Sequence, residues 1–333
     1  AKDVAAFRDQ IAEDMVPIVA KVKEAQRRRI GVEKLAFYDE PISFADGNAV
    51  PEGTPDEILA AGKKMYQELS PETAEFIGFM FENELFDVLS RDGKAPGGYC
   101  TEIADYKSPF IFSNFNATAG DVDVLTHEAG HAFEAYRAFK QELPSLLHSP
   151  TIEACECHSM SMEFLTAPWH HLFFGKQTDK YELGHCEDAL VFIPYGCMVD
   201  EFQHKVYENP GMTPEQRNEL WLSLEKKYRP WIDFDNLPFY SRGGGWQRQL
   251  HIYEVPLYYI DYCMAQTVAF QFWNLSRENY AEAWKRYMTF VDKAGTFRPE
   301  LVESAGLKVP YHAGCIKEIG ESISRWLEEH ELG

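Results

Sequence analysis

The sequence predicts a mainly α-helical protein that contains a small β-sheet. Apolar residues recur at helical spacing over residues 1–30, and further helices are expected over residues 56–69 and 71–89. Residues 123–133 also have the apolar faces of a helix. In contrast, the segment 108–115 alternates and is rich in aromatic residues, which is typical of a strand. Because this pattern is rare in the chain, we expect helices to build most of the fold.

The strand expected at residues 108–115 comes just before the helix at residues 123–133. We expect it to lie at the edge of the sheet. An exposed edge can bind an extended peptide through backbone hydrogen bonds. An ordinary edge strand without a ligand is the equally weighted alternative, and the sequence does not choose between the two.

The composition excludes several classes of protein. The chain has 333 residues, 45% of them hydrophobic and 14% aromatic, so it can bury a large core and is not a disordered chain. A formal net charge of −21 argues against a nucleic-acid-binding surface. No apolar run approaches the roughly 20 residues that cross a bilayer, and residues 1–30 are too charged for a signal peptide. Seven scattered cysteines without a Cys-x-x-Cys pair favour free thiols in a reducing compartment, so we expect a cytoplasmic protein.

A metal-binding motif, His-Glu-x-x-His, occupies residues 127–131. On a helix, His127 and His131 lie on one face at positions i and i+4, where both can bind one metal ion. Glu128 lies about 100° around the helix from His127 and can reach a metal-bound water molecule without binding the metal itself. Gly130 costs a helix about 1 kcal/mol relative to Ala, which indicates that a neighbouring backbone or a ligand approaches closely. A core helix that carries two histidines by chance is the less favoured alternative.

The motif by itself lacks a third ligand. A catalytic zinc ion typically has three protein ligands and a water molecule in the fourth position. The segment 151–164 is compatible with a helix and offers Glu153, Glu156, Cys157 and His158. Because Glu153 and Glu156 share one helix face at i, i+3, residue chemistry and spacing leave all four candidates open.

A second group of polar aromatic residues begins at His251 and continues into a tyrosine-rich segment. Pro256 suits the first turn of a helix. Tyr259 and Tyr262 then share one helix face at i, i+3. Taken alone, a tyrosine-rich helix is more often part of a core or an interface than of a catalytic site.

The motif at residues 127–131 and the later segment Glu-Cys-His-Ser-Met-Ser-Met-Glu, from Glu156 to Glu163, resemble the thimet oligopeptidase and oligoendopeptidase F family (M3). That family has His-Glu-x-Gly-His and then Glu-x-x-Ser-x-x-x-Glu on a later helix. The resemblance implies a zincin-type helical peptidase with a small β-sheet beside the metal helix and a substrate channel between helical lobes. It also implies that Glu156 is the third zinc ligand and that Glu163 supports the site.

The family also has a histidine followed by a tyrosine-rich helix, whose side chains bind the substrate and the oxyanion of the tetrahedral intermediate. By this resemblance Tyr262 is the oxyanion donor, and Tyr259 and His251 are additional donors. The gap between the histidine and the tyrosines varies within the family, which leaves Tyr258 as an alternative to Tyr259. A neutral donor of this kind can stabilise an oxyanion by about 3–4 kcal/mol.

The resemblance predicts a zinc metallo-endopeptidase that hydrolyses internal bonds of short oligopeptides through a metal-activated water. One Zn2+ ion per chain and Glu128 as the general base are expected. A zinc metallocarboxypeptidase of similar helical fold and a non-catalytic peptide-binding fragment are the alternatives. Short peptides are the expected partners, and binding to nucleic acid or to a membrane is not expected.

The expected domain organisation also follows from the resemblance. Residues 1–90 are expected to form a helical N-terminal part of the catalytic region, and residues 91–333 the zinc peptidase domain. The family's long additional N-terminal helical region is absent from this sequence. The chain is therefore expected to be a fragment, to need a partner chain, or to have a more open cleft. The sequence does not give the oligomeric state.

Overall fold

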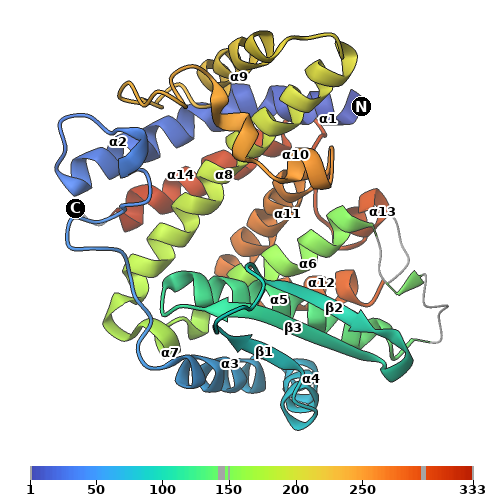
Figure 1. Ribbon diagram of the computed structural model, residues 1–333. Helices are drawn as coiled ribbons and strands as arrows, with labels where there is room; N and C mark the ends of the chain where they lie inside the picture. The colour runs from blue at the N-terminus through green and yellow to red at the C-terminus, as the bar shows by residue number, and fades with distance from the viewer. Residues whose placement is uncertain (1, 142–146, 149–150, 294–297, 332–333) are drawn as a thin grey trace. The chain divides into compact units, whose positions relative to one another are not determined.

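The computed structural model describes residues 2–141, 147–148, 151–293 and 298–331. In these ranges the chain is mainly helical and contains a three-stranded sheet, which confirms the expected fold class (Figure 1). The chain divides into two compact units, each built from segments that are far apart in the sequence. Unit 1 comprises Ala1–Asn48, Leu183–Thr267 and Pro310–Gly333, and unit 2 comprises Ala49–Glu182 and Val268–Val309. The expected domain boundary near residue 90 and the channel between lobes stay predictions.

Unit 1 is built from helices and their connections in the part of it that the structure describes. The N-terminal stretch predicted as one helix is helical throughout but contains a π-helical segment, η1. Thr213 starts α9 as its sequence suggests, because its Oγ1 accepts a hydrogen bond from the backbone N–H of Gln216. The elements that lie wholly or partly in this unit are α1 (Lys2–Gln10), η1 (Ile11–Met15), α2 (Val16–Ile30), η2 (Phe37–Asp39), α8 (Thr178–Glu208), α9 (Pro214–Tyr228), η7 (Gly244–Arg248), α10 (His251–Glu254), α11 (Tyr259–Glu278) and α14 (Cys315–His330).

Unit 2 combines helices with the sheet. Ser70 caps α4, because its Oγ accepts a hydrogen bond from the backbone N–H of Thr73 at 3.1 Å. Helix α5 packs against β3 and β2, and α6 packs against α5. The elements that lie wholly in this unit are α3 (Pro55–Leu69), α4 (Pro71–Glu82), β1 (Phe86–Leu89), β2 (Tyr99–Ile103), η3 (Ala104–Tyr106), β3 (Ser108–Phe115), α5 (Ala119–Ala138), α6 (Ile152–Leu165), η5 (Ala167–Trp169), α7 (His171–Phe174), η6 (Gly175–Gln177), α12 (Tyr280–Val291) and α13 (Arg298–Ser304).

The strand predicted at residues 108–115 is present as β3, but its expected place at the edge of the sheet is wrong. The strand order is β1-β3-β2, so β3 is the central strand (Figure 1). It pairs in parallel with β1 and antiparallel with β2; Ile111 lies opposite Phe86 on one side and Cys100 on the other. Its side chains alternate between more and less buried positions, as the sequence pattern indicates. The edge that could accept an extended peptide next to the metal helix is therefore β2.

The helix expected over residues 71–89 is shorter than predicted. Helix α4 ends at Glu82, and Phe86–Leu89 form β1. Between them Glu84 has a φ of 52°, a left-handed conformation that ends the helix. The apolar residues of this segment have helical spacing, but residues 86–89 pair with β3 instead. Tertiary contacts of this kind override a weak local preference for helix.

The helix start expected at Pro256 is also wrong. Helix α10 ends at Glu254 and α11 begins at Tyr259, so Pro256 lies in the turn between them. Leu257 in this turn has a φ of 66°, and its backbone N–H donates a 2.8 Å hydrogen bond to Oε1 of the buried Gln203. This distant contact fixes a turn that local sequence does not indicate.

In the described residues, the helices are all too short or too polar to pass through a bilayer.

Candidate metal centre and donor cluster

The pairing of α5 with α6 depends on Gly130. A Cβ atom at this position would lie 2.6 Å from the Cα of Ser159 and 2.9 Å from the carbonyl oxygen of His158. Both distances are shorter than real Cβ contacts. The close backbone approach expected from the glycine is therefore confirmed, and it brings the motif helix and the helix of the candidate third ligands into direct contact.

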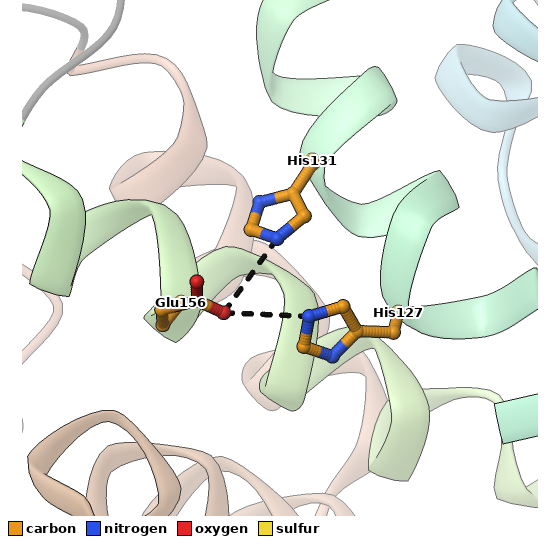
Figure 2. Close-up of side chains that lie close together, drawn as sticks. All are labelled: His127, His131 and Glu156. Carbon is orange, nitrogen blue, oxygen red and sulfur yellow. Dashed lines mark ion pairs between the residues drawn. The ribbon is translucent and has the colours of Figure 1, made fainter. Parts of the chain in front are cut away.

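Three side chains from these two helices form a cluster that could hold a metal ion. Their ligand atoms, on His127, His131 and Glu156, all lie within 4.8 Å of one another. Figure 2 shows both imidazole rings, from α5, directed toward the carboxylate of Glu156 on α6. Oε2 of Glu156 is 3.3 Å from Nε2 of His127 and 3.6 Å from Nε2 of His131. We call these three residues the metal cluster.

The other candidates for the third ligand lie outside the metal cluster. Cys157 is fully buried. His158 is buried as well and packs edge-on against the ring of Phe290, with 4.8 Å between ring centroids. Of the four candidates that the sequence left open, Glu156 is the one whose carboxylate meets both histidines.

Neighbouring groups orient the ligands of the metal cluster. Nδ1 of His127 lies 2.6 Å from Oε1 of Glu163, whereas the other ring nitrogen, Nε2, faces Glu156. In the neutral imidazole, a proton on Nδ1 that is shared with this carboxylate leaves the Nε2 lone pair available to a metal ion. Ser159 donates a hydrogen bond of 3.1 Å to Oε2 of Glu156. The arrangement therefore holds both ligand types in a fixed orientation.

The charges of the metal cluster favour a cation. Burial favours the neutral form of Glu156, but hydrogen bonds from His127 and His131 outweigh it and lower the pKa of this carboxyl well below its ordinary value. Burial lowers the pKa of His127, and hydrogen bonds to Glu156 and Glu163 reverse the effect and raise it well above its ordinary value. Two imidazoles and a carboxylate are a ligand set that catalytic zinc sites use. The residues present thus fit a zinc ion.

Glu128 follows His127 on α5 but is not part of the metal cluster. Its side chain is buried. Burial raises the pKa of the Glu128 carboxyl, while His127, His131 and a hydrogen bond from the backbone of Cys100 act in the opposite direction. A carboxyl with a raised pKa beside a cation site has the properties of a general base. Sequence reasoning missed the contact with Cys100, because a backbone group carries no side-chain signal and β2 was not predicted.

The structure also brings His251 together with the tyrosines that follow it. Ring centroids lie 4.8 Å apart for His251 and Tyr259, 5.9 Å for His251 and Tyr262, and 4.9 Å for Tyr258 and Tyr262. We call His251, Tyr258, Tyr259 and Tyr262 the donor cluster. It belongs to unit 1, whereas the metal cluster belongs to unit 2.

The tyrosines of the donor cluster differ in exposure. Tyr259 is buried, and burial raises the pKa of its hydroxyl above the ordinary value. Tyr258 and Tyr262 are half-buried. Because Tyr258 is more exposed than Tyr259, it is the more accessible of the two candidates for the partner of Tyr262.

Known proteins have sequences and structures similar to those of this chain. Residues 72–320 match the family model described as peptidase family M3. The oligoendopeptidase F homolog of Borreliella burgdorferi is 23% identical over 296 residues, which is 85% of this chain and 48% of that protein. PZ peptidase A, solved with an inhibitor, is 52% identical and matches with a TM-score of 0.96 over 100% of this chain and 59% of that chain. A solved structure from Bacillus anthracis strain Ames is 48% identical, with a TM-score of 0.89 over 100% of this chain and 57% of that chain.

This chain spans less than two thirds of the length of each of these relatives. The family model nevertheless covers most of the chain, including the metal cluster and the donor cluster. On this evidence the chain belongs to peptidase family M3.

Proposed function

We propose that this chain is a zinc-dependent metallo-endopeptidase that hydrolyses internal bonds of short oligopeptides. The observation that carries the proposal is the metal cluster, in which His127, His131 and Glu156 meet with Glu128 beside them. Membership of a peptidase family supports the reaction class. We also infer a reducing, cytoplasmic location, because the seven cysteines are scattered along the sequence and include no Cys-x-x-Cys pair.

In the proposed mechanism each residue has one role. A zinc ion held by His127, His131 and Glu156 would lower the pKa of its bound water toward neutrality and polarise the scissile carbonyl. Glu128 accepts the proton of the attacking water and delivers it to the leaving amine. Tyr262 donates a hydrogen bond to the developing oxyanion, with His251 and either Tyr259 or Tyr258 as further donors.

We further propose that the peptide binds as an added strand on β2. The residues of this strand are mostly exposed, and it is an edge strand of the sheet. The backbone of Cys100, within β2, contacts Glu128. A peptide paired with this edge would be held by backbone hydrogen bonds that do not depend on its sequence, which suits an enzyme for varied short peptides.

The test is cleavage of an end-blocked, internally quenched peptide of about ten residues. We expect internal cleavage that a chelator abolishes and added zinc restores. Substitution Glu128→Gln should lower kcat by about 10²–10⁴-fold and leave one zinc per chain, because it removes the proton acceptor and no ligand. The exposed Glu82 on α4 provides the control Glu82→Gln, which should change neither activity nor zinc content.

The alternatives give different results in the same assay. A metallocarboxypeptidase would cleave the free peptide but not the end-blocked one. A peptide-binding fragment would retain zinc without cleaving either. Full activity of a pure Glu128→Gln preparation would rule out the role proposed for this carboxylate.

A further inference from the structure

Gln249 links α8 to the donor cluster within unit 1. It lies between η7 and α10, two residues before His251. The hydroxyl of Tyr195, on α8, donates a hydrogen bond of 2.7 Å to Oε1 of Gln249. Nε2 of Gln249 lies 2.8 Å from Nδ1 of His251. The three side chains thus form a hydrogen-bonded chain that ends on the imidazole ring.

The hydroxyl of Tyr195 sets the direction of these two hydrogen bonds, because it donates to Gln249. Burial raises the pKa of Tyr195 to about 12, although Arg229 and Arg248 act in the opposite direction, so the hydroxyl keeps its proton. The guanidinium of Arg229 lies 5.0 Å from the centre of the Tyr195 ring, and nearby positive charge makes a phenol a stronger donor. When the amide oxygen of Gln249 accepts from Tyr195, the amide NH2 group points toward His251. An amide NH2 group only donates, so Nδ1 of His251 is the acceptor.

Gln249 is held in place by its surroundings. Segment η7, which precedes it, packs tightly against α9: a Cβ atom on Gly245 would lie 2.7 Å from Nε1 of Trp221. The backbone N–H of Gln249 donates to the carbonyl oxygen of Trp246 at 3.2 Å. The ring of Tyr259 meets Tyr195 edge-on, with 5.9 Å between ring centroids. Tyr195 and Gln249 are therefore packed against the donor cluster.

We propose that Tyr195 and Gln249 are positioning residues that hold His251 as a neutral imidazole with its proton on Nε2. A neutral imidazole has one N–H group, and an Nδ1 atom that accepts a hydrogen bond leaves that proton on Nε2. His251 then acts as a neutral donor, like the tyrosines beside it. The role of His251 as a donor to the oxyanion rests on the proposed function. The position of the proton on its ring does not depend on that function.

The first experiment reads the tautomer without any activity. Nitrogen NMR of zinc-loaded, 15N-histidine-labelled protein distinguishes a protonated from an unprotonated ring nitrogen, and the signals missing from His251→Asn identify this residue among the 11 histidines. At a pH where His251 is neutral, we expect a protonated Nε2 and an unprotonated Nδ1. In Gln249→Glu the new carboxylate accepts from the ring, so the proton should move to Nδ1. A protonated Nδ1 of His251 in the wild-type protein would overturn the proposal even if the enzyme is active.

The second experiment measures kcat and KM on the quenched peptide. Gln249→Glu and Tyr195→Phe should lower kcat by roughly 10–100-fold at unchanged zinc content, with a smaller change in KM. The control is Tyr228→Phe, which removes another tyrosine hydrogen bond of this unit, to Glu201 at 2.6 Å, and should leave kcat unchanged. If the NMR shows the expected tautomer but neither variant lowers kcat, the positioning role is wrong while the proposed function stands. If the wild-type protein does not cleave the peptide, the proposed function fails, and the NMR result still shows which ring nitrogen of His251 carries the proton.

Discussion

The metal cluster and the donor cluster surround their histidines with different chemical groups. In the metal cluster, the buried carboxylate of Glu156 meets both histidines and Glu163 contacts His127 from outside, so that hydrogen bonds hold Glu156 ionised and raise the pKa of His127. In the donor cluster, Nδ1 of His251 lies 2.8 Å from the amide nitrogen of Gln249, and its ring meets the uncharged rings of Tyr259 and Tyr262. Carboxylate partners prepare a histidine to bind a cation, whereas neutral partners prepare a histidine to donate a hydrogen bond. The neighbours of each imidazole therefore decide its chemistry.

The two clusters also differ in how they are built. The metal cluster depends on a close contact of two regular helices at Gly130. The donor cluster spans a short helix, a turn and the start of a long helix, and the turn is fixed by the bond from Leu257 to Gln203. Substitutions in the first cluster should thus act on metal affinity and stability, and substitutions in the second on turnover.

The largest effect is expected for Glu156→Gln. The substitution removes the negative charge that offsets a divalent cation, so zinc affinity should fall by more than the roughly 10–100-fold that loss of an orienting partner costs, and activity should be lost with it. Metal analysis after dialysis measures the bound zinc. Glu153→Gln, one turn earlier on α6 and outside the metal cluster, is the matched control and should retain one zinc per chain. Full zinc occupancy in Glu156→Gln would show that the carboxylate is not a ligand.

A large effect on turnover without loss of metal is expected for Tyr262→Phe. Removal of one oxyanion donor should lower kcat by about 10²–10³-fold, because the hydroxyl acts mainly in the transition state. Steady-state kinetics together with zinc analysis tests this. Comparison with Tyr258→Phe and Tyr259→Phe shows which tyrosine assists, and the half-buried Tyr258 is expected to matter more. Loss of zinc in Tyr262→Phe would contradict the division of labour between the two clusters.

A smaller effect, and a shift with pH, is expected for Glu163→Gln. Loss of the carboxylate that orients His127 should weaken zinc binding by roughly 10–100-fold. Zinc must displace a proton from His127, so affinity falls as the pH drops through the raised pKa of this histidine. Because Glu163 is one of the groups that raise this pKa, its removal should move the fall in affinity to lower pH. Zinc titrations with a competing chelator over a range of pH measure both effects, and an unchanged pH profile would disprove the coupling.

The smallest expected effect is on stability. Gly130→Ala forces α5 and α6 apart and should lower the free energy of unfolding by about 1–3 kcal/mol. Gly78 on α4 is the matched control, since a Cβ atom there meets no atom within 4 Å and alanine favours a helix by about 1 kcal/mol. Denaturant unfolding compares the two. We expect Gly78→Ala to raise the free energy of unfolding and Gly130→Ala to lower it. If both substitutions raise it, the close contact between α5 and α6 does not require a glycine at position 130.

The sequence determined the features that depend on residues close together in the chain. The spacing of His127 and His131 places both on one helix face, since 3.6 residues make one turn. The alternation at residues 108–115 is that of a strand, and β3 is found there. A glycine inside the motif helix indicated a close neighbour, and α6 is that neighbour.

Only the tertiary structure decided what depends on distant partners. Spacing left four candidates for the third ligand, and the packing of α6 on α5 brings one of them, Glu156, to both histidines. The central position of β3, the strand at Phe86–Leu89 and the turn at Pro256 were each predicted wrongly. Each is fixed by a hydrogen-bonded partner elsewhere in the chain, and hydrophobic periodicity reports a local conformation but not the partner that it meets.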